Sequence, residues 1–291
     1  MSDTSRMVGA LPVGAVEDSV RHALAEDLGR AGDITTNSVV PVDAMLSGTI
    51  SAREAGRIAG VDLAVASFRQ LDRGIKIEVQ KGDGSDVLPG DPLFILNGNA
   101  RAILTAERTA LNFLGHLSGI ATATHRLVQA VEGTAAQICC TRKTTPGMRV
   151  FEKHAVRMGG GVNHRFGLDD AVLIKDNHLA MAGGVRQAVE AARANVGHMV
   201  RIEVEVDTLE QLNEALEVGV EIILLDNMSP ETLREAVKRN ENRAVLEASG
   251  GITLETVRLV ADAGVDLISV GWITHSAACL DLGLDHSPLS L

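Results

Sequence analysis

The second half of the chain alternates short apolar runs with longer segments of helical periodicity. Six runs have the length and composition of buried strands: Ala136–Cys140, Ala171–Ile174, Arg201–Val206, Glu221–Leu225, Ala244–Leu246 and Asp266–Val270. Their starts lie 20 to 35 residues apart, which leaves room for a helix after each strand. This alternation predicts βα units and a parallel sheet. Six units in about 140 residues favour an incomplete α/β barrel of the TIM type, with an open doubly wound sheet as the alternative.

Helix boundaries in this region carry their own signals. Ser229 precedes Pro230, which predicts a capped helix start with proline in the first turn. Thr208 opens the spacing of a capping box. A further helix is expected to begin near Thr253 and to stop at Gly264.

The first hundred residues predict a mixed α/β unit. Val13–Leu28 has helical periodicity and precedes a polar turn at 32–36. Ile75–Val79 alternates apolar and polar residues, as a half-buried strand does. A long helix is predicted over Leu104–Val131, where the leucines form a buried stripe. Arg108 lies on this helix, and its spacing alone favours a solvated arginine.

Charge is distributed unevenly along the chain. The 291 residues contain 27 Lys and Arg against 38 Asp and Glu, a formal net charge of −11. The stretch Thr141–His178, called here the basic island, holds seven basic residues against four acidic ones. Such a local excess indicates an anion site. With no Tyr, one Trp and five Phe, the chain lacks the aromatics of a nucleic-acid surface, so the expected ligand is small and multiply negative.

Cysteine usage and hydropathy bear on the cellular location. The three cysteines, Cys139, Cys140 and Cys279, suggest neither a disulfide framework nor a cysteine zinc site. We find no long apolar segment and no apolar signal core near the N-terminus. A cytoplasmic location is therefore expected.

Polar residues follow all six predicted strands. In a parallel βα barrel, functional groups come from the C-terminal ends of the strands and the loops after them. These positions hold Thr141-Arg142-Lys143-Thr144, Lys175-Asp176-Asn177, Glu203 with Glu205 and Asp207, Asp226-Asn227, Glu247-Ala248-Ser249-Gly250-Gly251 and Gly271-Trp272-Ile273-Thr274-His275-Ser276. One active site at the strand ends is predicted.

Part of this site is suited to a ribosyl diphosphate. Ser249–Gly251 precedes a predicted helix start, where backbone N–H groups bind phosphate, and Gly271 follows the next strand. Lys175, Glu205 and Asp226 must pair with each other, a metal or a ligand, because an unpaired charge in a barrel interior is costly. The two carboxylates are candidates to stabilise the reacting ribose carbon, hold its hydroxyls or bind a metal.

The remaining cations indicate a second anionic substrate. The strand ends and their loops carry more positive groups than one ribosyl diphosphate requires, namely Arg142, Lys143, His164 and Arg165. Arginine binds carboxylates through paired hydrogen bonds, so a small dicarboxylate is expected. Three other histidines lack metal-site spacing and are interpreted as packed or surface residues: His116, His154 and His178.

Nine strings, in order along nearly the whole chain, resemble quinolinate phosphoribosyltransferases. They are EDLGRAGDITT (26–36), LTAERTALNFLGHLSGIAT (104–122), TRKTTPGMR (141–149), GGGVNHR (159–165), IKDNH (174–178), VEVD (204–207), LLDN (224–227), LEASGGI (246–252) and THS (274–276). Each string alone is a weak signal, but nine collinear ones are specific to the family.

The resemblance implies a reaction and a fold. Quinolinate and phosphoribosyl pyrophosphate would give nicotinate mononucleotide, CO₂ and pyrophosphate with Mg²⁺, a step of de novo NAD biosynthesis. The implied fold is α/β throughout: an N-terminal α/β sandwich (residues 1–116) and a C-terminal incomplete, TIM-like α/β barrel (residues 117–275). The C-terminal tail, residues 276–291, would pack back on the first domain.

The resemblance also assigns roles to individual residues. The carboxylates of quinolinate would be bound by Arg142, His164, Arg165 and Lys175. The strand-end residues expected around the phosphoribosyl group are Lys143, Glu205 and Asp226, and Thr141 is a further predicted substrate-binding residue. Of these, Glu205 and Asp226 are also the candidate metal ligands, and the expected catalytic groups are Lys143, Lys175, Glu205 and Asp226. The phosphate loops would be Ser249, Gly250, Gly251, Gly271, Trp272 and Ile273.

Family members form homodimers in which the arginine matching Arg108 enters the neighbouring active site. This implication replaces the solvated interpretation of Arg108. Trp272 departs from the family pattern, because a small residue more often follows that glycine. The side-chain contribution at Trp272 is therefore left open.

Three rival functions remain at this point. A related phosphoribosyltransferase, using nicotinate or associated with molybdate transport, would need fewer cations than this chain provides. A Schiff-base aldolase would use Lys175 but leaves the arginine and lysine cluster unexplained. A non-catalytic anion-binding protein would have no use for Glu205 and Asp226 beside the cations.

Overall fold

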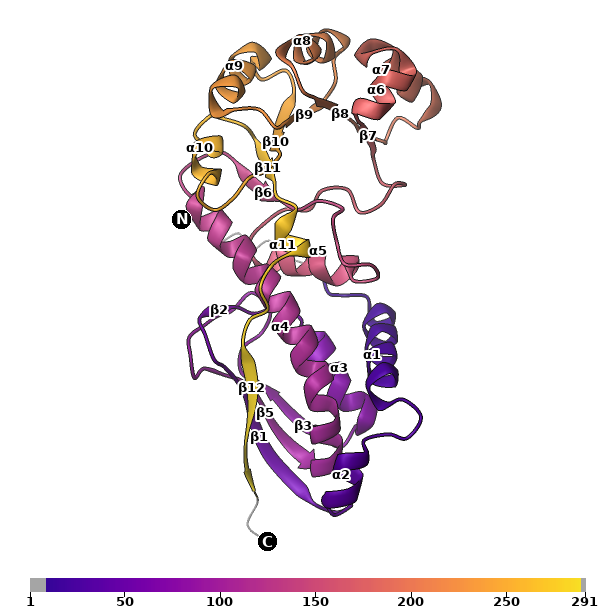
Figure 1. The fold of residues 1–291 in the computed structure, drawn as a ribbon, viewed down its shortest axis with the longest axis vertical. Helices are drawn as coiled ribbons and strands as arrows, with labels where there is room; N and C mark the ends of the chain where they lie inside the picture. Colours follow the sequence, from indigo (N-terminus) through magenta and orange to yellow (C-terminus); the bar gives the residue numbers. More distant parts are fainter. Residues whose placement is uncertain (1–8, 289–291) are drawn as a thin grey trace. The chain divides into compact units, whose positions relative to one another are not determined.

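The computed structural model describes residues 9–288, which form two compact units, each described separately here (Figure 1). The first unit comprises residues 9–123, 150–160 and 276–288, and the second comprises Thr124–Arg149 and Gly161–His275. Residues 150–160, which the expected domain division assigns to the barrel, thus lie within the first unit. Among the described helices, none is long and apolar enough to span a membrane.

An antiparallel sheet of four strands forms the centre of the first unit. Its strands lie in the order β12-β1-β5-β3. Their bounds are β1 Met45–Ala52, β3 Lys76–Val79, β5 Pro92–Asn99 and β12 Leu282–Pro288. Two short strands, β2 (Gly56–Arg57) and β4 (Asp86–Val87), pair separately. The alternating run predicted at 75–79 is confirmed as strand β3.

Five helices belong wholly or partly to the first unit: α1 Val13–Leu28, α2 Ile34–Val39, α3 Val61–Leu71, α4 Ala100–Ala130 and α5 Arg149–Met158. The bounds predicted for α1 are confirmed, and the long predicted helix is α4. The polar turn expected at 32–36 is instead the start of α2. There, Asp33 caps the helix by accepting a hydrogen bond from the backbone N–H of Thr36.

The core of the first unit lies between its sheet and its helices. Ile50 of β1, Leu96 of β5, Phe68 of α3 and Ile103 of α4 belong to one cluster, and all four are fully buried. Burying a side chain of this size contributes about 1.5–3 kcal/mol. This shared core joins α3 and α4 to the sheet.

The C-terminal tail also packs within this unit. Strand β12 runs antiparallel to β1, from the pair Leu46 and Pro288 to the pair Ala52 and Leu282. A side chain at Gly119 of α4 would collide with the carbonyl of Ala278, so the glycine is what permits this close approach.

The second unit contains a parallel sheet of six strands in the order β6-β11-β10-β9-β8-β7. The strands are β6 Gln137–Cys139, β7 Val172–Ile174, β8 Ile202–Val206, β9 Ile222–Asp226, β10 Val245–Ser249 and β11 Leu267–Ser269. All six predicted strands are confirmed. Within the described residues β6 and β7 are the edges of this sheet, so the barrel is incomplete. The ring-like strand order rules out the doubly wound alternative.

Each of the six strands is followed by a helix, as the βα pattern predicts. Helix α5, which follows β6, lies mostly in the first unit, and the helices of the second unit are α6 Asp176–Ala182, α7 Val185–Asn195, α8 Leu209–Val218, α9 Pro230–Asn240, α10 Val257–Ala261 and α11 Trp272–His275. In Figure 1, α7, α8 and α9 stand in a row outside the arc of strands. The predicted caps are confirmed, since Ser229 and Thr208 each accept a hydrogen bond from a backbone N–H in the first turn of the following helix.

One helix prediction is wrong. The segment expected to be helical from Thr253 to Gly264 forms only the five residues of α10, Val257–Ala261. The N–H of Thr253 donates to the hydroxyl of Thr256, at 2.9 Å. This side-chain bond caps the turn at 253–256, and the helical backbone bonds begin where the N–H of Val257 donates to the Thr253 carbonyl at 3.0 Å.

Candidate active site

A cavity of about 750 Å³ lies in the second unit, at the C-terminal ends of the barrel strands. Thirteen of the predicted site residues line it: Thr141, Arg142, Lys143, His164, Arg165, Lys175, Glu205, Asp226, Ser249, Gly250, Gly251, Gly271 and Trp272. Ile273 is fully buried and lies outside the cavity lining. Arg108 is exposed on α4, within the first unit.

The basic island does not act as one surface. Arg142 and Arg165 line the cavity, whereas Lys153 and Arg157 lie on α5 in the first unit. Helix α5 divides the basic island, because its side chains contact residues of the first unit. One example is His154, whose Nε2 lies 2.8 Å from a carboxylate oxygen of Asp83. Net charge along a segment therefore overstated the number of cations at the site.

Arg149 holds the backbone of the island without lining the cavity. Its guanidinium donates to the Thr144 hydroxyl at 2.9 Å, to the Phe166 carbonyl at 3.0 Å and to the Arg142 carbonyl at 3.3 Å. The loop after β6 is thus joined to the loop before β7. The first loop follows the edge strand β6, and the second loop precedes the other edge strand, β7.

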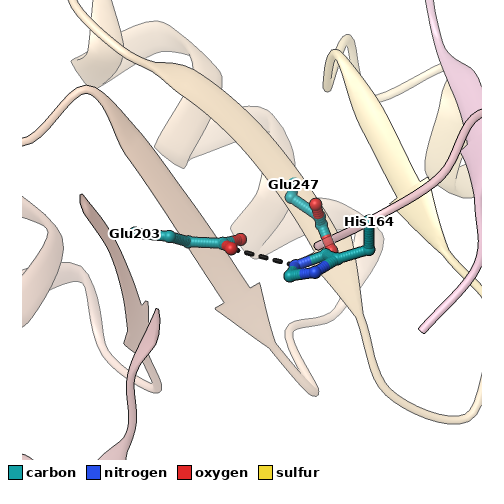
Figure 2. A group of neighbouring side chains, drawn as sticks. All are labelled: His164, Glu203 and Glu247. Carbon is teal, nitrogen blue, oxygen red and sulfur yellow. Dashed lines mark ion pairs between the residues drawn. The ribbon is translucent and has the colours of Figure 1, made fainter. Parts of the chain in front are cut away.

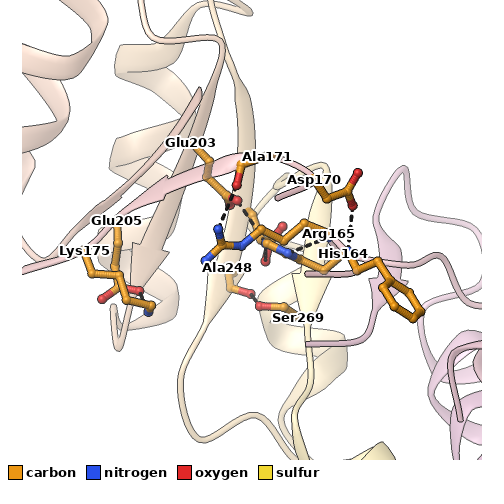
Figure 3. A network of polar contacts seen from close by, with 11 residues as sticks. His164, Arg165, Asp170, Ala171, Lys175, Glu203, Glu205, Ala248 and Ser269 are labelled. Atoms are coloured by element: carbon orange, nitrogen blue, oxygen red, sulfur yellow. Dashed lines mark hydrogen bonds and ion pairs between the residues drawn. The ribbon is translucent and has the colours of Figure 1, made fainter. Parts of the chain in front are cut away.

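Arg165 is held at its backbone, whose N–H donates to Nδ1 of His164 at 2.8 Å, and at its side chain. One of its Nη atoms donates to the Ala171 carbonyl at 2.7 Å (Figure 3). Burial, reinforced by the nearby charge of Arg142, lowers the pKa of Arg165, and Glu203 and Asp170 oppose that shift. The Arg142–Arg165 pair is therefore unfavourable by itself and is stabilised by negative charge.

Two buried carboxyl groups beside His164, those of Glu203 and Glu247, had no predicted role. His164 Nε2 lies 2.9 Å from a carboxylate oxygen of Glu203 and 3.8 Å from one of Glu247 (Figure 2). Their side chains are 8% and 3% exposed. The sequence did contain a signal for Glu203. Glu203 and Glu205 alternate with buried apolar residues in β8, so both glutamates face the same side of the sheet.

The Glu247 carboxyl has a strongly altered acidity. Burial is the main cause that raises its pKa to about 7, and the neighbouring charge of Glu203 adds to this effect. His164 and a hydrogen bond with Ser269 act in the opposite direction. One oxygen of each glutamate, like the Nε atoms of Arg142 and Arg165, is buried without a hydrogen-bond partner among the described residues. The cluster therefore contains buried charged groups whose hydrogen bonds within the described residues are incomplete.

The next strands carry a cation and two further carboxylates. Lys175, after β7, forms an ion pair with Glu205 of β8 (Figure 3). Asp226 ends β9 and accepts a hydrogen bond from the side chain of Asn227 at 2.6 Å. Asn227 has a φ of 53°, and its backbone N–H donates to the carbonyl of Ser249. The bond from Asn227 to Ser249 joins the ends of β9 and β10.

The glycine loops lie next to one another. Gly250 has a φ of 104°, and a side chain there would meet the backbone of Asn227, so glycine is required. Trp272 donates its indole N–H to the carbonyl of Ile252 at 3.0 Å, and Thr274 donates to the carbonyl of Lys143 at 2.8 Å. The loops after β6, β10 and β11 thus form one connected rim. Helix α10 has only five residues and does not offer a long helix end to an anion. An anion at this rim would instead meet the backbone N–H groups of the glycine loops.

The histidines interpreted as packed or surface residues take structural positions. His116 contacts Glu152 at 2.9 Å and His154 contacts Asp83, both within the first unit. His178 accepts a hydrogen bond from the backbone N–H of Lys175. None of the three lines the cavity.

Two family models match the chain in sequence. The N-terminal domain of quinolinate phosphoribosyl transferase matches residues 33–118, and its C-terminal domain matches residues 120–285. Nicotinate-nucleotide pyrophosphorylase [carboxylating] of Mycobacterium leprae is 47% identical over 276 residues, covering 93% of this chain and 97% of that protein.

Solved structures agree with this match. The nicotinate-nucleotide pyrophosphorylase of Francisella tularensis superposes with a TM-score of 0.92 at 41% identity, covering 96% of this chain and 98% of that one. NadC from Streptococcus pyogenes gives a TM-score of 0.93 at 38% identity, covering 97% and 100%. Because sequence, domain order and fold all match along nearly the whole length, this chain belongs to the quinolinate phosphoribosyltransferase family.

Proposed function

We propose that this protein transfers the phosphoribosyl group of phosphoribosyl pyrophosphate to quinolinate. Loss of CO₂ then gives nicotinate mononucleotide, with pyrophosphate as the second product. One observation carries the proposal: a single cavity is lined by Arg142 and Arg165 from the loops beside the open edges of the sheet, by the carboxylates of β8 and β9, and by the glycine loops. That arrangement suits two anions of different shape.

The cations favour a dicarboxylate over a monocarboxylate. Arg142 and Arg165 each offer a fork of donors to a carboxylate, and each charge-assisted hydrogen bond contributes about 1.5–3 kcal/mol. Lys175 is paired with Glu205, so it contributes to the charged wall of the cavity. A Schiff-base aldolase would use Lys175 but would leave the Arg142–Arg165 pair unexplained.

Binding the two substrates side by side brings the pyridine nitrogen against the ribose C1 carbon. The bond from C1 to the diphosphate oxygen breaks as the nitrogen forms its bond to C1. Glu205 and Asp226 supply the negative charge that stabilises the positive character of C1 during this step. The backbone N–H groups of Ser249–Gly251 and Gly271 hold the phosphates.

Decarboxylation follows from the charge on the pyridine nitrogen. When the bond between C2 and the adjacent carboxylate breaks and CO₂ leaves, the electron pair stays on C2, where the neighbouring positive nitrogen stabilises it by its charge. The resulting carbanion takes a proton from solvent or from the ammonium of Lys175. Arg142 and Arg165 keep the second carboxylate, the one retained in the product, in place.

The residues fit a magnesium ion carried by the diphosphate. Glu205 and Asp226 offer oxygen atoms at the cavity wall, and Mg²⁺ is commonly bound by one or two carboxylates together with substrate phosphates and water. Mg²⁺ would neutralise the diphosphate and assist its departure.

The proposal includes a homodimer. Arg108 is exposed in its own unit and lies outside the cavity lining, and the family resemblance assigns its counterpart to the neighbouring active site. A partner's Arg108 would add a third guanidinium to the dicarboxylate site. Assembly would then be required for full activity. A cytoplasmic location stays a prediction.

One assay tests the proposal. The protein, Mg²⁺ and phosphoribosyl pyrophosphate are mixed with either quinolinate or nicotinate, and mononucleotide, pyrophosphate and CO₂ are measured. We expect product and CO₂ from quinolinate alone. Product only from nicotinate would establish the rival phosphoribosyltransferase, and absence of pyrophosphate with either substrate would favour a non-catalytic anion-binding protein.

A further inference from the structure

Lys143 is held at both its backbone polar groups by threonine hydroxyls. Its N–H donates to Oγ1 of Thr141 at 3.0 Å, and its carbonyl accepts from Oγ1 of Thr274 at 2.8 Å. Thr141 is a near neighbour in sequence, whereas Thr274 belongs to α11, 131 positions away. The second bond therefore fixes the lysine to the segment that follows β11.

The hydroxyl of Thr274 directs its proton to Lys143. Its Oγ1 lies 2.8 Å from the Lys143 carbonyl oxygen and 3.1 Å from that of Gly271. A hydroxyl has one proton to donate, and the Gly271 carbonyl already accepts from the backbone N–H of Thr274 at 3.2 Å. Thr274 is only 1% exposed, so solvent does not compete for this proton. The shorter bond, to Lys143, is therefore the one that the hydroxyl makes.

The side chain of Lys143 passes over Gly271. A side chain at Gly271 would first meet Cδ of Lys143, at 3.1 Å, while atoms of His275 and Thr141 lie at an ordinary contact distance of 3.6 Å. Gly271 does not have the left-handed backbone conformation that favours glycine, so its backbone alone does not require one. The missing side chain at 271 therefore makes room for the stem of the lysine.

We propose that Thr274 is a positioning residue for the phosphoribosyl half of the cavity. Its hydroxyl fixes the backbone of Lys143, and Gly271 provides the surface on which the lysine stem lies, so that the ammonium faces phosphate in the glycine loops. This inference rests on the proposed function. It goes beyond that function by giving a role to the string at 274–276, which the family resemblance left without one.

Flexibility of lysine is the physical reason for such a support. Lys143 is exposed at the cavity wall, and its stem has four rotatable carbon atoms between the backbone and the charge. A side chain that samples many rotamers loses conformational entropy when a ligand immobilises it. Because the backbone and the stem are held before the ligand arrives, less entropy is lost on binding. Thr274 therefore acts on phosphate affinity although it is buried outside the cavity lining.

Calorimetry with pyrophosphate, which carries the diphosphate group of the substrate, tests the role of the hydroxyl. Thr274→Val removes the hydroxyl and keeps the shape of the side chain, while Thr274→Ser keeps a hydroxyl. Because one buried hydrogen bond is lost, we expect Thr274→Val to raise the Kd for pyrophosphate about tenfold, and Thr274→Ser to stay within about twofold of the unaltered protein. Quinolinate, held by the Arg142–Arg165 pair, should bind both variants within about twofold of its normal affinity.

Selective loss separates positioning from a general structural effect. If Thr274→Val weakened pyrophosphate and quinolinate binding equally, the hydroxyl would support the whole rim and the proposal would be wrong. Unchanged pyrophosphate binding in Thr274→Val would contradict it as well, and so would a loss in Thr274→Ser as large as that in Thr274→Val.

A second test uses the contact at Gly271 and does not depend on the folding of Thr274→Val. The added methyl of Gly271→Ala would press against the lysine stem, so we expect the Kd for pyrophosphate to rise about tenfold. In Lys143→Ala, where the stem is absent, the same change at 271 should alter the Kd by less than about twofold. A methyl that is equally damaging with and without the lysine would act on the phosphate itself and would overturn the proposal.

These outcomes are distinguishable from a failure of the proposed function. If the unaltered protein does not bind pyrophosphate, both the function and the role of Thr274 are wrong. If the unaltered protein converts quinolinate to product but the variants give any of the contrary patterns, only the role of Thr274 is wrong.

Discussion

Trp272 donates its indole N–H to the carbonyl oxygen of Ile252 at 3.0 Å, and this bond joins the two glycine loops. Ile252 directly follows Gly251, while Trp272 directly follows Gly271. The side chain therefore fixes the separation of the backbone N–H groups proposed to hold the phosphates. The departure of this residue from the family pattern thus has a structural purpose in this chain.

Trp272→Phe should weaken binding of phosphoribosyl pyrophosphate. The phenyl ring keeps much of the packing but lacks the N–H donor, so we expect its KM to rise about fivefold to tenfold, the cost of one hydrogen bond. The KM for quinolinate should stay within about twofold, because the bond lies in the glycine loops. Steady-state kinetics with each substrate varied in turn measures both, and equal rises in the two KM values would contradict this role.

The same tryptophan provides a direct binding signal. It is the only Trp of the chain and lines the cavity. Pyrophosphate added to the unaltered protein should change its emission with a saturable dependence. Trp272→Phe serves as the control that removes the signal, and an emission that does not respond to pyrophosphate or phosphoribosyl pyrophosphate would place the phosphates elsewhere.

Arg149→Lys should impair quinolinate binding although it preserves the charge. Lysine cannot make the three separate bonds that Arg149 makes to Thr144, Phe166 and Arg142. Loss of two of them releases the Arg142 loop, and we expect the KM for quinolinate to rise about tenfold or more. Arg157→Lys, a like change on α5 in the first unit, is the control expected to behave as the unaltered protein. Normal kinetics in Arg149→Lys would mean that charge alone matters there.

The Glu247 carboxyl should make stability depend on pH. Its pKa is about 7 in the folded protein and near 4.5 when unfolded, so between these values the folded protein keeps a proton that the unfolded chain releases. This contribution is fully present below pH 4.5 and is lost as the pH rises through 7. Its slope reaches at most about 1.4 kcal/mol per pH unit.

Urea unfolding of the unaltered protein and of Glu247→Gln, measured from pH 5 to pH 8, isolates this effect. The stability of the glutamine variant should fall less over that range, because its amide does not ionise. Parallel curves for the two proteins would show that Glu247 titrates near its ordinary value.

Glu205→Gln and Asp226→Asn should lower turnover more than they weaken quinolinate binding. Each change removes negative charge that stabilises C1 only as the diphosphate leaves, and removal of such a group commonly costs about 10²- to 10³-fold in kcat. Rapid-quench measurement of product formation gives kcat, and calorimetry gives quinolinate affinity. A variant that binds quinolinate poorly yet turns over normally would reverse the assignment of its carboxylate.

Mixing two inactive variants tests whether Arg108 acts across a dimer. Arg108→Ala lacks the group donated to the neighbour, and Arg142→Ala lacks one in its own cavity. Random reassembly makes half of the dimers mixed, each with one complete site, so activity should recover to about a quarter of the unaltered level. Recovery should depend on subunit exchange, and a mixture that stays inactive after exchange would place Arg108 in its own subunit's site or outside the site.

Local sequence signals predicted much of the barrel. The six strands, the Ser229 and Thr208 caps and the bounds of α1 were all confirmed, because apolar periodicity and capping act over a few residues. The helix predicted from Thr253 to Gly264 was too long at both ends, because residues 254–256 form a turn before α10 and residues 262–264 form a turn after it.

The site was harder to predict where residues distant in sequence meet. The basic island looked continuous, yet α5 carries Lys153 and Arg157 into the first unit. Glu203 and Glu247 were visible at strand ends, but nothing in the linear pattern placed both carboxyls against His164. Charge counted along a segment gives no information about which side of a fold each side chain faces.

The sequence by itself determined the βα rhythm, the polar strand ends and the family, because periodicity, capping and collinear motifs are properties of neighbouring residues. Only the tertiary structure decided which charges share a cavity and how they are held. Arg149 supports Arg142 from outside the cavity, and the backbone N–H of Arg165 donates to the imidazole of His164. The physical reason is that hydrogen bonding and burial depend on distances in space, which the order of residues along the chain does not specify.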